Sequence, residues 1–182
     1  MSAAQASAAI KSRIRTIPNC PEPGVLFRDI TTLLGDGAGF RLAIRLLTDR
    51  YAGTRIDKVA AIEARGFIIG APLACALGAG FVPIRKQGKL PAATIGRDYD
   101  LEYGADRIEI HTDAIAADEH VLLVDDLLAT GGTAGAACAL LRQAGGRIVE
   151  CAFVIDLPSL GGRQRLERQG VRVFALTGFA DG

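Results

Sequence analysis

The chain has 182 residues, the length of one domain. Hydrophobic residues make up 49% and charged residues 23%, a balance that excludes a disordered chain. Lys and Arg number 21 and Asp and Glu number 20, so the net charge of +1 provides no general attraction to nucleic acid or to an anionic membrane.

Two N-terminal helices are expected, with an extended crossing between them. Residues 4–16 have helical composition, with isoleucines about one turn apart. The segment 18–24, rich in Pro and Gly, ends that helix and forces an extended path. A second helix is predicted to start with Asp36 as its N-terminal cap and to run to about Tyr51.

The rest of the chain alternates short apolar runs with helical segments. Strands are predicted over residues 58–62, 81–84, 121–124, 148–155 and 171–175, and helices over 67–77, 133–144 and 159–169. Because the apolar runs lack polar alternation and are joined by helices, they predict an α/β fold with a central parallel sheet flanked by helices on both faces. We expect residues 1–182 to form one domain.

Residues 86–104 interrupt this rhythm. They are polar, contain several glycines and a proline, and are too long for an ordinary connection. We therefore predict a flexible loop that acts as a lid over a functional site.

The cysteines and the longest uncharged run indicate a cytoplasmic protein without a membrane span. The four cysteines show no CxxC spacing, and with only two histidines a zinc site is not expected. Cys75 and Cys138 lie in apolar stretches, so we expect both thiols to be buried. The N-terminus lacks a basic segment followed by an apolar one, so no signal peptide is expected. Residues 66–84 carry no charge, but their glycines and prolines favour buried core over a continuous span.

The most informative stretch is residues 121–133, VLLVDDLLATGGT. It combines a buried strand that ends in two carboxylates, Asp125 and Asp126, with a small-residue loop that opens a helix. Ligands bind at the carboxyl ends of strands in such sheets, and each carboxylate can accept two hydrogen bonds, as vicinal ribose hydroxyls require. Adjacent acids at a strand end are costly without a partner, although a capped helix with merely solvated acids stays open as an alternative.

The loop itself has the composition of a phosphate site. Backbone N–H groups in a turn that leads into a helix form an anion nest, and the helix dipole adds to it. Gly131 and Gly132 let a phosphate approach the main chain, and Thr130 and Thr133 supply hydroxyl donors. The chain contains neither a GxxxxGKS/T P-loop nor a dinucleotide GxGxxG motif.

Residues 121–133 resemble the phosphoribosyl-pyrophosphate (PRPP) signature of the type I phosphoribosyltransferase family, and VDDLLATGGT is similar to the variant in its adenine-using members. Four more segments look like those of the same enzymes, in the same order: 23–30, 63–67, 85–91 and 99–104. The resemblance implies the type I phosphoribosyltransferase fold, with a long flexible catalytic loop at 86–104 and a small N-terminal base-binding hood within 1–35. It also implies a homodimer that transfers 5-phosphoribose from PRPP to adenine, giving AMP and pyrophosphate in purine salvage.

The resemblance assigns roles to individual residues as well. It implies that Asp125 and Asp126 bind the ribose, and that the 5′-phosphate is bound by Ala129, Thr130, Gly131, Gly132 and Thr133. Pyrophosphate binding is assigned to Arg65, Arg85, Lys86, Lys89 and Tyr103, and adenine binding to Leu26, Phe27 and Arg28. For Phe27, plain core packing is an equal alternative.

Glu102 is the expected acid–base residue, because the family places a loop glutamate near the purine N7 and Glu102 matches it. Closure of the loop would desolvate this carboxylate and raise its pKa. The neighbouring Asp100 is the rival, and Arg97 has no assigned role. Mg²⁺ is expected on chemical grounds, held mainly by PRPP without a direct protein ligand.

Two other functions stay open. A transferase for xanthine or another 6-oxopurine would use the same anion sites. A PRPP-sensing regulator would share the fold but usually adds a DNA-binding segment or a basic face. The 35 residues before Asp36 contain only four Lys or Arg, which disfavours the regulator.

Overall fold

The structure is a computed structural model that describes residues 1–100 and 105–180. The strands are β1 (Arg15–Pro18), β2 (Leu26–Asp29), β3 (Lys58–Ile62), β4 (Gly80–Lys86), β5 (Thr94–Asp100), β6 (Ala105–His111), β7 (His120–Leu128), β8 (Arg147–Asp156) and β9 (Val173–Gly178). The helices are α1 (Ala3–Lys11), α2 (Thr31–Gly35), α3 (Gly37–Tyr51), α4 (Arg65–Leu77), α5 (Gly132–Gln143), α6 (Gly162–Arg168) and the short 3₁₀ helix η1 (Pro158–Leu160).

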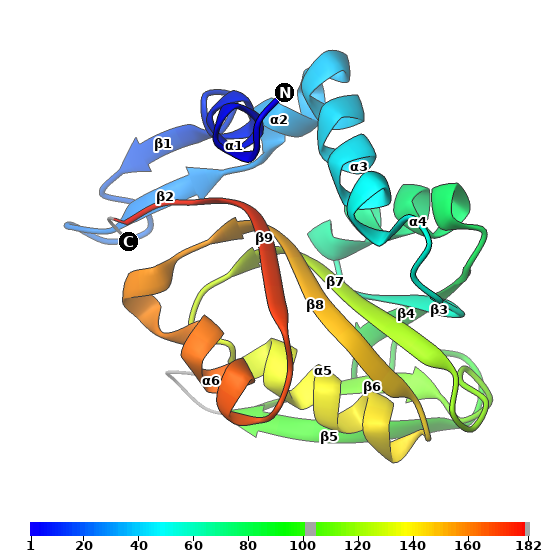
Figure 1. The fold of residues 1–182 in the computed structure, drawn as a ribbon. Coiled ribbons are helices and arrows are strands. Elements are labelled where there is room, and N and C mark those ends of the chain that lie inside the picture. The colour runs from blue at the N-terminus through cyan, green and yellow to red at the C-terminus, as the bar shows by residue number, and fades with distance from the viewer. Residues whose placement is uncertain (101–104, 181–182) are drawn as a thin grey trace.

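A seven-stranded sheet forms the centre of the fold, in the order β5-β6-β4-β3-β7-β8-β9 (Figure 1). Five neighbouring strands of this sheet, β4, β3, β7, β8 and β9, are parallel, which confirms the predicted parallel sheet for that part. Along β7, Leu122 and Val124 pack with α3 and α4, whereas Val121 and Leu123 pack with α5 and α6 on the other face. Both faces are therefore covered, which explains why these strands lack polar alternation.

The prediction of a flexible lid loop over residues 86–104 is wrong for residues 94–100. They form β5, which pairs antiparallel with β6, and β6 pairs antiparallel with β4. Ile108 and Ile110 of β6 are buried, whereas Arg107 forms an exposed ion pair with Asp98 at 3.0 Å. This half-buried hairpin alternates polar and apolar residues, so a search for continuous apolar runs misses both strands.

The first helix is shorter than predicted. α1 ends at Lys11, and residues 15–18 form β1, which lies antiparallel to β2 with Ile17 opposite Phe27. The strand pairing with a distant segment outweighs the helical composition of residues 4–16. The ammonium of Lys11 donates to the carbonyl of Gly178 at 2.9 Å, and this contact ties the N-terminal hood to β9.

Other local predictions have mixed outcomes. Asp36 caps α3, and its carboxylate accepts the N–H of Ala38 at 3.0 Å, as predicted. Cys138 is buried, but the prediction is wrong for Cys75, which lies on the outward face of the apolar helix α4. The uncharged run 66–84 divides into α4 and β4. Within the described ranges, none of the helices combines the length and apolarity needed to cross a bilayer.

Candidate active site

A cavity of about 230 Å³ lies where the chain leaves β3 and β7 and enters α5. The whole predicted phosphate loop, residues 129–133, lines it. Further lining side chains come from the neighbouring strands and include Asp125, Lys86, Glu63 and Tyr99. Residues that the sequence assigned to three parts of one substrate thus meet at the carboxyl end of the sheet.

Two glycines that face each other shape the loop. Gly131 has a φ of +74°, in the left-handed region that favours glycine, and is the N-cap of α5. Gly162, at the start of α6, packs so closely that a Cβ there would collide with the carbonyl oxygen of Ala129 and lie 2.9 Å from the nitrogen of Gly131. Sequence reasoning missed Gly162, because a packing partner from a later element leaves no local pattern. The loop N–H groups stand at the N-terminus of α5, where the helix dipole favours an anion.

The two acids have different partners. They lie within β7, which continues to Leu128, rather than at the strand end as predicted. Asp125 lines the cavity, and its Oδ1 accepts the N–H of Asp126 at 2.9 Å. Burial and the charge of Asp126 raise the pKa of Asp125 well above its ordinary value. Asp126 accepts a hydrogen bond from Nε of Arg65, and this ion pair raises the pKa of the Arg65 guanidinium.

Of the described cations assigned to pyrophosphate, Lys86 is the one that lines the cavity. Its Nζ pairs with Asp106 at 3.0 Å, which raises the pKa of Lys86. Arg85 donates to Glu63 at 2.8 Å and to the carbonyl of Lys89 at 2.9 Å, and the Lys89 side chain is exposed. The arginines on this side of the sheet are thus held by carboxylates, whose place an incoming pyrophosphate would take or share.

Three polar residues at the site were not predicted: Glu63, Tyr99 and Asp106. Glu63 and Tyr99 line the cavity, and the Tyr99 hydroxyl donates to Asp106 at 3.2 Å. Burial raises the pKa of Tyr99. Glu63 and Tyr99 each begin a family-like segment, so their position was available from the sequence, whereas their contacts were not.

The hood carries the three residues assigned to adenine. Leu26, Phe27 and Arg28 lie on β2, above the ends of β7 to β9 in Figure 1, but outside the cavity lining. Phe27 is 40% exposed, which excludes the alternative of plain core packing. The buried Arg28 places its guanidinium 4.3 Å from the ring centre of Phe179 and donates to Thr16 at 2.5 Å. This fixes the strand and leaves Phe27 available to a planar ligand.

Glu102 and Tyr103 are outside the described residues. Arg97 lines a separate polar cavity of about 270 Å³, with Arg165 of α6 and the first turn of α5. Arg97, to which the sequence assigned no role, therefore does not line the candidate site.

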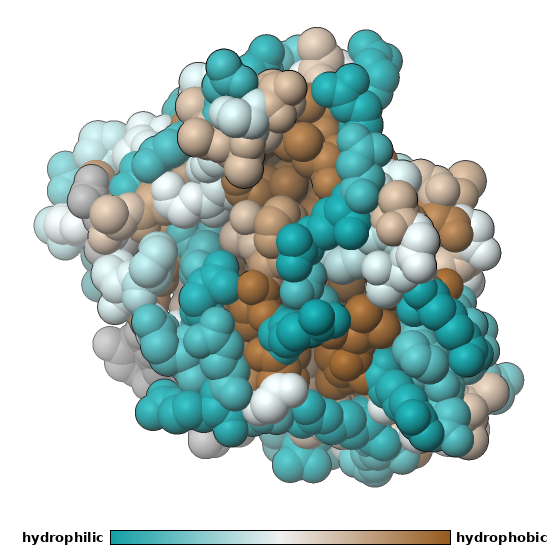
Figure 2. Space-filling view, viewed as in Figure 1, coloured by the Kyte–Doolittle hydropathy of each residue, from teal (hydrophilic) through white to brown (hydrophobic). Residues whose placement is uncertain are grey.

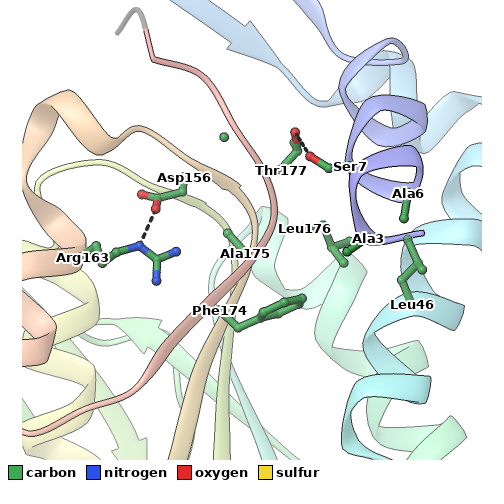
Figure 3. Close-up of a pocket in the computed structure, with 11 residues that line it drawn as sticks. Ala3, Ala6, Ser7, Leu46, Asp156, Arg163, Phe174, Ala175, Leu176 and Thr177 are labelled. Carbon is green, nitrogen blue, oxygen red and sulfur yellow. Dashed lines mark hydrogen bonds and ion pairs between the residues drawn. The ribbon is translucent and has the colours of Figure 1, made fainter.

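A larger cavity, of about 470 Å³, lies along β9 between α1, α3 and α6. Figure 2 shows hydrophobic residues in a hollow of this face, and Figure 3 shows the polar pairs at its two sides. Arg163 donates to Asp156 at 2.8 Å, and Ser7 donates to Thr177 at 3.0 Å. None of the sequence-predicted site residues lines this cavity, so its size does not make it the candidate site.

Known proteins resemble this chain over nearly its whole length. Residues 31–173 match the model of the phosphoribosyl transferase domain. The chain is 65% identical over 170 residues to the adenine phosphoribosyltransferase of Nitrosospira multiformis, which covers 93% of this chain and 97% of that protein. It is 62% identical over 173 residues to the enzyme of the same name from Nitrosomonas europaea, which covers 95% and 99%.

Solved structures agree with the fold. The crystal structure of adenine phosphoribosyltransferase from Rhodothermus marinus has a TM-score of 0.89 and 49% identity, and covers 97% of this chain and 99% of that one. The Saccharomyces cerevisiae enzyme, complexed with adenine and an imino-altritol bisphosphate, has a TM-score of 0.88 and 38% identity, and covers 95% and 99%. The fold is therefore that of the type I phosphoribosyltransferases, and the chain belongs to the phosphoribosyl transferase family.

Proposed function

We propose that this protein transfers 5-phosphoribose from PRPP to adenine and forms AMP and pyrophosphate in purine salvage. The observation that carries the proposal is the cavity itself. An anion-binding loop at the start of α5, Asp125 and Lys86 line it together, and these are the kinds of group that a 5′-phosphate, a ribose and a pyrophosphate require. The relatives named adenine phosphoribosyltransferase support the choice of base.

The loop 129–133 binds the 5′-phosphate. Backbone N–H groups at the N-terminus of α5 and the hydroxyls of Thr130 and Thr133 donate to its oxygens. Asp125 faces the ribose hydroxyls, and its carboxylate oxygens can accept hydrogen bonds from them. Asp126 completes the ribose site and holds Arg65.

Pyrophosphate is the leaving group, and cations stabilise it. Lys86 stands at the cavity, and Arg65 and Arg85 reach it by exchanging their carboxylate partners for pyrophosphate oxygens. Lys89 and Tyr103 complete this set. Bond breaking at C1 runs ahead of attack by N9, so charge on the departing pyrophosphate is what the protein must stabilise.

The hood and Glu102 handle the base. Phe27 stacks on adenine, and main-chain groups of Leu26 and Arg28 read its N1 acceptor and exocyclic donor. A 6-oxopurine would reverse that polarity and leave buried groups unpaired, at a cost of about 1–3 kcal/mol per group. Glu102 takes the proton from N7 of the 7H tautomer of adenine, in which the N9 lone pair is free to attack C1.

The donor set at the cavity suits Mg²⁺. Asp125 and Glu63 offer carboxylate oxygens, which Mg²⁺ prefers, although no group of three or more His, Cys, Asp or Glu among the described residues is arranged to hold a metal. PRPP would hold the ion mainly by its pyrophosphate and ribose oxygens, and the ion supplies charge neutralisation of the leaving group. We also propose a cytoplasmic homodimer; the four free thiols support the compartment.

The decisive experiment measures pyrophosphate release from PRPP and Mg²⁺ with adenine, hypoxanthine or xanthine. We expect release with adenine and formation of AMP. Preferential use of a 6-oxopurine would overturn the base assignment, and PRPP binding without turnover would favour a sensor. Thr133→Val should raise the KM for PRPP. The matched control is Thr48→Val, since the Thr48 hydroxyl bonds to Ile44 within α3 and should leave KM unchanged.

A further inference from the structure

The ammonium of Lys86 is held by side chains outside the family-like cation segment. Its Nζ lies 3.0 Å from Oδ2 of Asp106, and the hydroxyl of Tyr99 donates to the same oxygen at 3.2 Å. The other oxygen of Asp106, Oδ1, accepts the N–H of Arg107 at 2.8 Å. The Asp106 carboxylate is therefore bound at both oxygens and is 23% exposed, whereas the Lys86 side chain is 59% exposed.

The network reaches the cavity of the phosphate loop through Tyr99. Burial and the Asp106 carboxylate raise the pKa of Tyr99. A tyrosine hydroxyl has one proton, and here the proton goes to Asp106, while Tyr99 lines the cavity together with Thr133. Lys86 and Tyr99, which share the Asp106 carboxylate, therefore line the same cavity as the phosphate loop.

We propose that Asp106 and Tyr99 are positioning residues, which hold the Lys86 ammonium at the cavity that the phosphate loop also lines. This rests on the proposed function, because PRPP carries a phosphate at one end of the ribose and a pyrophosphate at the other. Lys86 has three N–H donors, so it can keep Asp106 as a partner and still donate to pyrophosphate. A lysine that is held before binding loses less side-chain freedom when the ligand arrives.

A purely electrostatic role of Asp106 would have the opposite sign. A carboxylate repels pyrophosphate, so its removal would tighten binding if only its charge mattered. Asp98 offers the matched control on the same hairpin. It is also an acid in an ion pair, but its partner is Arg107, at 3.0 Å, rather than Lys86.

The test is a double-mutant cycle on Asp106 and Lys86, measured as the Kd of magnesium pyrophosphate by calorimetry and as the KM for PRPP. We expect Asp106→Asn to weaken pyrophosphate binding about threefold to tenfold, as expected for a lysine that must be ordered on binding. The KM for adenine should stay unchanged. In the Lys86→Met background the effect of Asp106→Asn should fall below about twofold. Asp98→Asn should leave the Kd unchanged.

Tyr99→Phe keeps the ring and removes the hydroxyl, so it should weaken binding in the same direction and only when Lys86 is present. If Asp106→Asn does not fold, the Kd of Tyr99→Phe with and without Lys86 tests the proposal instead. Tighter binding in Asp106→Asn, an equal loss with and without Lys86, or no pyrophosphate binding by the wild-type protein would overturn the proposal. Pyrophosphate binding without turnover of PRPP and adenine would instead count against the proposed function alone, because the cycle is read from Kd.

Discussion

Gly162 is a residue that the sequence did not assign to the site and whose substitution should nevertheless damage PRPP binding. A Cβ at this position would collide with the carbonyl oxygen of Ala129 and lie 2.9 Å from both the nitrogen of Gly131 and a methyl group of Leu128. Ordinary contact begins at 3.4 Å, so the loop or α6 must move by at least about 0.5 Å to relieve the contacts at 2.9 Å, and by more to relieve the collision with Ala129. Overpacking costs about 1–3 kcal/mol, which corresponds to a Tm lower by about 2–12 °C. Since a misplacement of about 1 Å can cost about 100-fold, Gly162→Ala should raise the KM for PRPP by at least about tenfold.

Thermal unfolding and a PRPP titration of the same samples check this prediction, and Gly37→Ala is the control. Gly37 begins α3, and nothing lies within 4 Å of its ideal Cβ. Alanine there should be neutral or stabilise the fold by about 0.4–1 kcal/mol, with unchanged PRPP affinity. A Gly162→Ala protein with wild-type Tm and wild-type affinity would refute the reasoning, because the loop could then retreat from α6 without consequence.

Three more predictions concern the base, the acid–base residue and the hood. Glu102→Gln should lower turnover about 10²–10⁴-fold in a steady-state assay while calorimetry shows PRPP binding intact, and unchanged turnover would remove Glu102 from its role. Phe27→Ala should raise the KM for adenine about 5–100-fold through lost stacking, with little change in Tm because the side chain is 40% exposed. A fall in Tm without a change in KM would assign Phe27 to packing instead. Hydrogen bonds from Thr31 and Arg15 lower the pKa of Asp29 from 3.8 to about 2. The stabilisation from Asp29 is therefore present above pH 4 and lost as the pH falls towards 2. We expect wild type to be more stable than Asp29→Asn above pH 4, and this difference to disappear as the pH falls towards 2, when unfolding is followed by circular dichroism.

Much of the central sheet was predictable, because a strand covered on both faces is apolar at every position. The run 58–62 is β3 as predicted, and the runs 121–124 and 148–155 lie inside β7 and β8. The start of α3 after Asp36 was predictable for a different reason, since a cap is a contact between residues two positions apart.

The hood strands and the β5–β6 hairpin were not predictable in this way. Residues 15–18 have helical neighbours and become a strand only because β2 pairs with them. The hairpin hides Ile108 and Ile110 between polar residues, so its composition is that of a loop. Cys75 illustrates the converse, since an apolar helix can still have an outward face.

The candidate site also has one part that the sequence predicts and one part that only the tertiary structure decides. The loop 129–133 was predictable from the sequence, because consecutive residues supply both its N–H groups and its hydroxyls. Its supports were decided by tertiary structure alone: Gly162 behind the loop and Asp106 beside Lys86 belong to other elements. A local pattern records the backbone conformation of its own residues, whereas contacts between elements depend on how the folded sheet brings distant segments together.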